Sequence, residues 1–225
     1  FFVLFNGIMF SKIGLPPFIA SLGTMMISKG FGSIFTKAQS VTWPAATTGE
    51  GWYRKIFKMT IGSGQDATII PTGFILLIVL AIIMSIFLSN TRPGRYILAL
   101  GSNKEATRLS GVNVMKWETL AYIISGTFAG IAGVAYASTY SVLLPGGGGG
   151  FELDAIAGVV IGGTSMSGGY GTIAGTLIGV FIMSVLKTGL PLIGLQPHYQ
   201  QFITGFVLVA AVFADVMNRR KKNKM

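Results

Sequence analysis

Long apolar segments are the feature that most constrains how this chain can fold. A helix needs about 20 consecutive apolar residues to cross the hydrocarbon core of a bilayer. Segments near this length recur along the chain and give the following candidate spans: Pro16–Phe35, Pro71–Leu88, Glu118–Thr139, Leu153–Met166, Thr172–Leu186 and Tyr199–Val216. The run Phe1–Phe10 is too short to span, so we expect the sequence to begin inside a further helix, with upstream helices missing. Residues 1–225 are therefore predicted to be one all-α, polytopic transmembrane domain with about six to seven transmembrane helices.

Composition excludes several functional classes. The residues are 51% hydrophobic and only 11% charged, which is too little charge to cover a soluble domain. The net charge of +10 lies in loops between apolar runs rather than on one face, which argues against a nucleic-acid partner. With no cysteine and one histidine, we expect no metal site. No Ser/His/Asp set and no GxxxxGK[ST] motif is present, so we expect neither a catalytic site nor a cofactor in this chain.

Lysine and arginine indicate the orientation. The loop over residues 90–117 and the tail over residues 217–225 are basic, and basic loops favour the cytoplasmic side. Two cytoplasmic ends require an even number of crossings between them. Parity therefore favours a true crossing at Leu153–Met166, with an inner turn at Ser167–Gly171. The loop over residues 36–70 is then predicted to be extracytoplasmic, although it is mildly basic.

The basic loop contains a signal for a short helix. Ser102 or Asn103 can cap a helix that runs from Lys104 to Ser110. An acid in its first turn, a base near its end and Gly111 after it are typical of a helix that stabilises its own ends. The helix is either an ordinary connector or an exposed knob that a soluble partner grips, and the residues alone leave both interpretations open.

Small residues repeat on two predicted helices. Glycines spaced three or four residues apart lie on one helical face and let neighbouring backbones approach closely. The positions concerned are Gly126, Gly130, Gly133, Gly171, Gly175 and Gly179. They indicate either static close packing or a surface that moves beside a transport pathway.

Polar residues inside the predicted spans are mostly hydroxyls, and acids fall near predicted span ends. Ion-coupled transporters commonly use buried acids. Their lack favours a pathway for a neutral polar solute that is driven from outside the chain. The candidates for this pathway are Thr164, Ser165 and Ser167, which could equally bond a neighbouring helix. The rival interpretations are a stand-alone channel or secondary transporter, and a membrane anchor without a pathway.

Four stretches resemble one family. Gly94–Val114, with the letters GRYILALGSNKEATRLSGVNV, is similar to the coupling loop of the ribose-type permeases of bacterial ABC importers. Leu15–Met25, the glycine-rich Glu152–Thr172, and Tyr199–Gly205 followed by Asp215 also resemble segments of this family, in the same order. The match extends over nearly the whole chain and is weakest at the Gly49–Ile70 region and the run Gly146–Gly150.

The resemblance implies a permease that carries a ribose-like monosaccharide inward across the bacterial cytoplasmic membrane, with its C-terminus in the cytoplasm. It implies a homodimer bound to a cytoplasmic ATPase, which would hold ATP and Mg²⁺, and fed by an external sugar-binding protein. By the match, a coupling helix docked on the ATPase would be formed by Asn103, Glu105, Ala106, Arg108, Leu109, Ser110 and Gly111. The resemblance does not choose the sugar.

Overall fold

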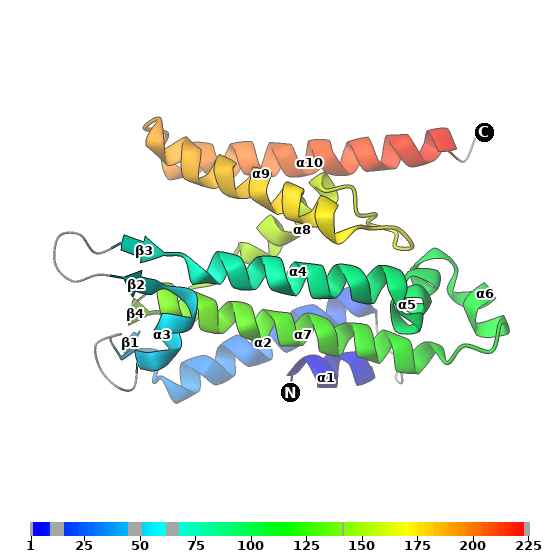
Figure 1. The fold of residues 1–225 in the computed structure, drawn as a ribbon, viewed down its shortest axis with the longest axis horizontal. Helices are drawn as coiled ribbons and strands as arrows, with labels where there is room; N and C mark the ends of the chain where they lie inside the picture. The colour runs from blue at the N-terminus through cyan, green and yellow to red at the C-terminus, as the bar shows by residue number, and fades with distance from the viewer. Residues whose placement is uncertain (1, 10–15, 45–50, 62–67, 141, 223–225) are drawn as a thin grey trace. The chain divides into compact units, whose positions relative to one another are not determined.

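The computed structural model describes residues 2–9, 16–44, 51–61, 68–140 and 142–222, and most of them are helical (Figure 1). The chain divides into two units, residues 1–80 with 113–147 and residues 81–112 with 148–225. Leu15, residues 45–50 and 62–67 of the predicted outer loop, and the last three residues of the predicted 217–225 tail lie outside the described residues.

The first unit is built around α7 (Val114–Thr139), which contacts α1 (Phe2–Ile8) and α3 (Trp52–Phe57). α2 (Pro17–Phe35) begins with proline in its first turn, where the missing N–H costs no hydrogen bond. The predicted 36–70 loop carries more structure than expected. It holds α3, β1 (Val41–Thr42), which pairs antiparallel with β4 (Val142–Leu143), and a hairpin of β2 (Met59–Ile61) with β3 (Thr68–Ile70).

The second unit contains α5 (Arg92–Ser102), α6 (Lys104–Leu109), α8 (Phe151–Ile161), α9 (Ile173–Leu192) and α10 (Pro197–Lys222). α8 packs on α9 and α10, and α9 also contacts α10. Residues near the start of α8 lie beside the end of α9, so the two helices form an antiparallel hairpin. α4 (Thr72–Asn90) contributes its first half to one unit and its second half to the other.

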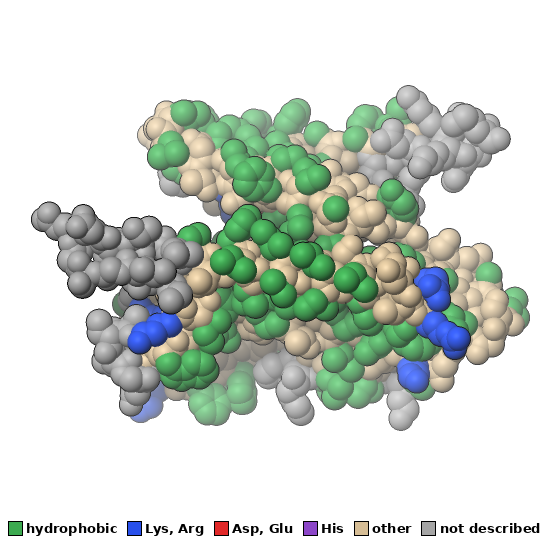
Figure 2. Space-filling model, viewed as in Figure 1, with side chains coloured by type: hydrophobic (Ala, Val, Ile, Leu, Met, Phe, Trp, Pro, Cys, Tyr) green, Lys and Arg blue, Asp and Glu red, His purple; other side chains and the backbone are tan. Residues whose placement is uncertain are grey.

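Apolar side chains remain exposed along the long helices. α4 buries none of its residues, and Figure 2 shows hydrophobic side chains over its visible face. Among the described residues, α2, α4, α7 and α9 are long and apolar enough to cross a membrane, and α10 contributes the shorter apolar stretch His198–Ala214. These findings confirm the prediction of an all-α polytopic membrane protein.

The structure corrects the crossing predicted at Leu153–Met166. α8 has only 11 residues and ends at Ile161, because Gly162 and Gly163 follow, the latter with φ +83°. At 1.5 Å per residue it is about 16 Å long, too short to cross a bilayer as a helix. The span predicted at Thr172–Leu186 is, by contrast, longer than expected, because α9 continues to Leu192. Parity of full crossings therefore no longer supports the orientation, which stays a prediction.

Candidate coupling and transport sites

The predicted short helix is present as α6, and its own residues hold both of its ends. Asn103 Oδ1 accepts a hydrogen bond from the Ala106 amide at 2.9 Å, which identifies Asn103 rather than Ser102 as the cap. At the other end, Gly111 adopts φ +81°, and its amide donates to the Arg108 carbonyl. The Ser110 hydroxyl donates to the Ala106 carbonyl. The residues named from the resemblance thus form one continuous self-capped turn.

The outer face of α6 is available to a partner. Arg108 donates to Glu105 at 2.5 Å, and both side chains are about two-thirds exposed. Leu109 is 78% exposed, whereas Thr107 on the same helix is buried. The exposed surface of α6 therefore combines one apolar side chain with the Glu105–Arg108 ion pair.

Replacing Asn103 with alanine is expected to loosen α6 by about 1 kcal/mol, because the Ala106 amide loses its capping oxygen. Hydrogen exchange of the α6 amides in the full-length protein measures this change and should be about fivefold faster. Asn113→Ala is the matched control, since Asn113 caps α7 in the same way. Unchanged exchange in α6 would show that the cap contributes little.

The helix before α6 was not predicted. α5 runs from Arg92 to Ser102, with Thr91 Oγ1 accepting from the Gly94 amide at 3.3 Å. Gly94 is required there, because a β-carbon would strike the carbonyl oxygens of Phe87 and Leu88 at the end of α4. α5 therefore joins the membrane helix α4 to the exposed knob through a tight turn.

The end of α5 touches the glycine loop that connects α8 to α9. A β-carbon on Gly101 would lie 2.5 Å from the Gly169 amide nitrogen, and one on Gly168 would lie 2.8 Å from the Gly101 carbonyl oxygen. Gly168 and Gly169 both have φ near +80°. Backbone therefore meets backbone at this point, without intervening side chains.

The predicted pathway residues lie in or beside this loop. Thr164 and Ser165 line a cavity of about 270 Å³ together with Gly101, Gly169 and Thr176. The Thr164 hydroxyl lies 3.4 Å from that of Thr176 on α9, and Ser165 is buried. Ser167 does not line the cavity, although its amide donates to Ser165 Oγ. The structure brings the three residues into one turn, and their role in transport stays a prediction.

The predicted glycine stripe on α9 forms the crossing with α8. A β-carbon on Gly175 would collide with the Gly162 carbonyl oxygen, and one on Gly179 would collide with that of Gly158. Gly171 faces the Thr164 side chain in the same way. The partner glycines on the α8 side, Gly158 and Gly162, were not singled out from the sequence, although their four-residue spacing was a usable signal.

The glycines of α7 behave differently from one another. A β-carbon on Gly126 would collide with the Val3 side chain, so this position packs α7 against α1. Gly130 and Gly133 have no atom within 4 Å of that position in the described part of the chain. No described residue therefore packs against these two glycines, and their predicted packing role stays a prediction.

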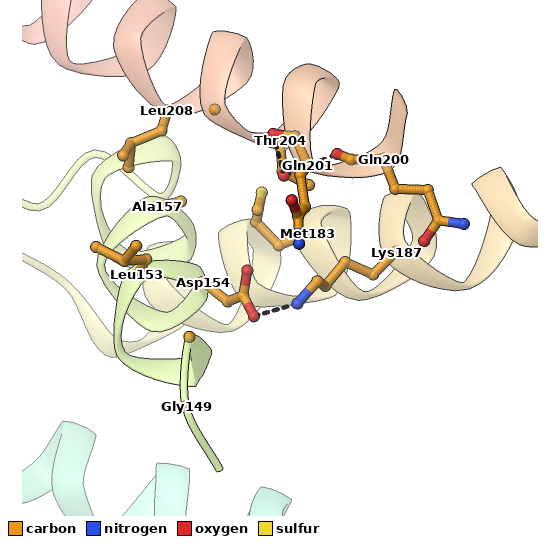
Figure 3. A pocket seen from close by; sticks show the side chains of 12 residues that line it. Gly149, Leu153, Asp154, Ala157, Met183, Lys187, Gln200, Gln201, Thr204 and Leu208 are labelled. Atoms are coloured by element: carbon orange, nitrogen blue, oxygen red, sulfur yellow. Dashed lines mark hydrogen bonds and ion pairs between the residues drawn. The ribbon is translucent and has the colours of Figure 1, made fainter. Parts of the chain in front are cut away.

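A charged pair that the sequence did not reveal joins α8 to α9. The Lys187 ammonium group donates to an Asp154 carboxylate oxygen across 33 positions of sequence. The sequence placed Asp154 near a span end, whereas Lys187 lies beyond the predicted end of its span at Leu186. Because α9 extends to Leu192, Lys187 is inside the helix. The pair borders a cavity of about 510 Å³ between α8, α9 and α10 (Figure 3).

Comparison with known proteins assigns this arrangement to a family of permeases. The profile described as "Branched-chain amino acid transport system / permease component" matches residues 1–212. The chain is 37% identical over 212 residues to the ribose import permease protein RbsC of Escherichia coli K12, covering 93% of this chain and 63% of that protein. It is 36% identical over 218 residues to RbsC of Bacillus subtilis 168, covering 97% and 64%.

Another relative carries a different sugar in its name. The galactose/methyl galactoside import permease protein MglC of Haemophilus influenzae is 34% identical over 225 residues, covering 97% of this chain and 64% of that protein. The chain therefore spans slightly less than two-thirds of the length of these relatives. No solved structure matches it.

Proposed function

The chain belongs to the family of branched-chain amino acid transport system permease components, and we propose on this premise that it is part of the membrane subunit of an ATP-driven monosaccharide importer. The matched relatives bear the names of ribose and galactose import permeases, which favours a sugar over an amino acid as the substrate. It is a transport subunit and not an enzyme.

The observation that carries the proposal is α6. This helix presents Glu105, Arg108 and Leu109 to solvent on a short turn whose ends are fixed by its own residues. A pre-formed turn loses little conformational entropy when a partner binds it. We assign this surface to a cytoplasmic ATPase that holds ATP and Mg²⁺. The loop over residues 90–117 and the C-terminus are then cytoplasmic, in agreement with their positive charge.

The remaining partners follow from the same proposal. A second copy of the permease completes the translocation path, and an extracytoplasmic sugar-binding protein delivers the substrate to the side opposite α6. ATP binding moves the ATPase subunits, and the docked α6 follows. Because the backbone of α5 lies in close contact with that of the 164–171 loop, a shift of α5 displaces that loop. Packed elements of this kind switch between discrete arrangements, which suits alternating access.

The test is purification of the full-length protein with its genomically neighbouring ATPase, followed by uptake of radiolabelled D-ribose and D-galactose into proteoliposomes. We expect the ATPase to co-purify and uptake of a monosaccharide to require ATP. Replacing Glu105 and Arg108 together with alanine should lower both co-purification and uptake by about tenfold or more, since interface energy concentrates in a few residues.

A variant that removes a charged side chain from another exposed helix provides the control. Lys55→Ala removes one exposed cation from α3, which belongs to the first unit, and should leave ATPase co-purification unchanged. Transport without ATP, or full ATP-driven uptake by the double variant, would contradict the coupling assignment. Uptake that follows an ion gradient instead would favour the secondary-transporter alternative.

A further inference from the structure

A mainly apolar cavity that also exposes several polar side chains lies between three helices of the second unit. It is bordered by Asp154 on α8, Lys187 on α9, and Gln201 and Thr204 on α10 (Figure 3). Its volume of about 510 Å³ is within the range of sites for small organic molecules. Apolar side chains, Met183 among them, form much of the remaining wall, together with glycines and Gln200.

The ion pair at this cavity is an unusual feature for apolar helices. Asp154 is 22% exposed and Lys187 is 45% exposed, so both charges face the cavity rather than being sealed between helices. Charged side chains within membrane segments are costly, and they commonly mark substrate pathways. The close approach of the α8 and α9 backbones does not depend on this ion pair, because it is already made at Gly158 and Gly162.

We propose that this cavity binds a single monosaccharide on the transport route, and that Asp154 and Lys187 are the side chains that recognise its hydroxyl groups. The proposal rests on the proposed function, because the substrate class is taken from it. The carboxylate can accept from two neighbouring hydroxyls while the ammonium group donates to a ring or hydroxyl oxygen, and such charge-assisted bonds are the stronger kind. The opposite charges cancel, so the cavity favours a neutral ligand over an ion.

The other walls suit the same ligand. The Gln201 amide makes no hydrogen bond to any described residue, and Figure 3 shows it on the cavity side of α10, toward α9. An amide supplies both donors and an acceptor to a polyol. Met183 and Leu153 give the apolar surface that the C–H face of a sugar ring needs. The neighbouring Gln200 is already occupied, since its amide nitrogen donates to the Leu195 carbonyl at 2.9 Å.

The cavity lies at the end of the α8–α9 hairpin that is remote from the coupling loop. Lys187 is 14 residues beyond Ile173, about 21 Å along α9 at 1.5 Å per residue. The loop before Ile173 is the segment that touches Gly101. Under the proposed orientation the cavity is therefore the outward end of the route, where a sugar arrives before the inner loop opens.

A single engineered cysteine tests the site directly. Gly205 lines the cavity, and a β-carbon there meets no atom within 4 Å, so Gly205→Cys places a thiol in it without a clash. The 225 residues contain no cysteine, and any cysteine elsewhere in the full-length protein is first replaced by serine. Gly189→Cys is the matched control, because it has equal room on α9 and does not line the cavity.

The measurement is the rate of methanethiosulfonate labelling of the full-length protein in nanodiscs, in the presence of D-ribose, D-galactose or glycine betaine. We expect one of the sugars that the transporter carries to slow labelling of Gly205→Cys, with the rate about halved at a concentration equal to the Kd. Labelling of Gly189→Cys should not respond. Asp154→Asn or Lys187→Met, added to Gly205→Cys, should raise the sugar concentration that halves the labelling rate by about tenfold. Glu152→Gln, the same kind of change two residues from Asp154 and outside the cavity, should not.

A charge swap distinguishes sugar recognition by the ion pair from a purely structural role in holding α8 against α9. Asp154→Lys combined with Lys187→Asp restores an ion pair between α8 and α9, yet presents the carboxylate and the ammonium group from exchanged positions. We expect this folded variant to remain unprotected by sugar. If sugar protected the swapped variant from labelling as fully as it protects Gly205→Cys alone, the ion pair would have only a structural role and the proposal would be overturned.

The outcomes distinguish this proposal from the proposed function. If wild-type protein takes up a monosaccharide with ATP but that sugar never slows labelling of Gly205→Cys, the cavity is not the site and the importer function stands. If no monosaccharide is taken up with ATP, the proposed function fails and this site fails with it. Protection by the transported sugar that is lost in Asp154→Asn and in the swap establishes the site.

Discussion

Gly179→Ala is expected to prevent the α8–α9 hairpin from closing and to leave little folded protein in the membrane. A β-carbon at this position would lie 1.9 Å from the Gly158 carbonyl oxygen and 2.6 Å from the Gly162 amide nitrogen. Both neighbours are backbone atoms of another element, so no side-chain rotation relieves the clash. The hairpin would have to separate along its length, which costs about 3 kcal/mol or more.

Gly189→Ala on the same helix provides the comparison. Both residues are glycines within α9, but a β-carbon on Gly189 meets nothing within 4 Å. Helix propensity slightly favours alanine at both positions, by up to about 1 kcal/mol. We expect a normal yield and thermal stability in detergent for Gly189→Ala, and a yield reduced about tenfold or more for Gly179→Ala. Equal yields would show that the hairpin tolerates a wider spacing and that Gly179 is not a close-packing position.

The sequence predicted best those features whose causes lie close together along the chain. α6 is the example: its cap, the acid in its first turn, the base near its end and its terminating glycine all lie between Asn103 and Gly111. The long apolar helices were equally predictable, because bilayer thickness sets their length. α5 was missed because Pro93 and Gly94 are typical helix breakers, although proline is tolerated in a first turn and Thr91 supplies the cap.

Features that depend on distant residues were not predictable in this way. The crossing predicted for residues 153–166 relied on the parity of the two basic ends, whereas Gly162 and Gly163 end α8 and turn the chain back onto itself. The pairing of Asp154 with Lys187 requires the antiparallel register of two helices, which no spacing in a single sequence specifies. The same holds for the contact between Gly101 and Gly169, which joins the end of α5 to a loop far away in the chain.

Gly169→Ala is expected to uncouple ATP hydrolysis from sugar movement. Gly169 has φ +80°, and a β-carbon there would lie 2.8 Å from the Cα atom of Ser102, at the end of α5. The substitution therefore pushes the 164–171 loop away from the element that leads to α6. Under the proposed function we expect ATP hydrolysis to continue while the number of sugars transported per ATP falls about tenfold, measured in proteoliposomes with both quantities followed together.

The strain of placing alanine in a left-handed conformation must be separated from the loss of the contact. Gly163→Ala does this, because Gly163 has φ +83° in the same connection but no atom within 4 Å of its β-carbon position. Both variants carry the left-handed penalty of about 1–2 kcal/mol. Only Gly169→Ala also disturbs α5. Equal transport per ATP in the two variants would mean that the contact carries no coupling.

The same contact can be disturbed from its other side. A β-carbon on Gly101, which is helical and carries no left-handed strain, would lie 2.5 Å from the Gly169 amide nitrogen. Gly101→Ala should therefore reproduce the loss of sugars per ATP without the strain. Agreement between the two variants, with Gly163→Ala near wild type, would locate the coupling step at this backbone contact. An effect of Gly169→Ala without one of Gly101→Ala would instead assign the defect to the loop itself, because a coupling contact must respond to displacement from either partner.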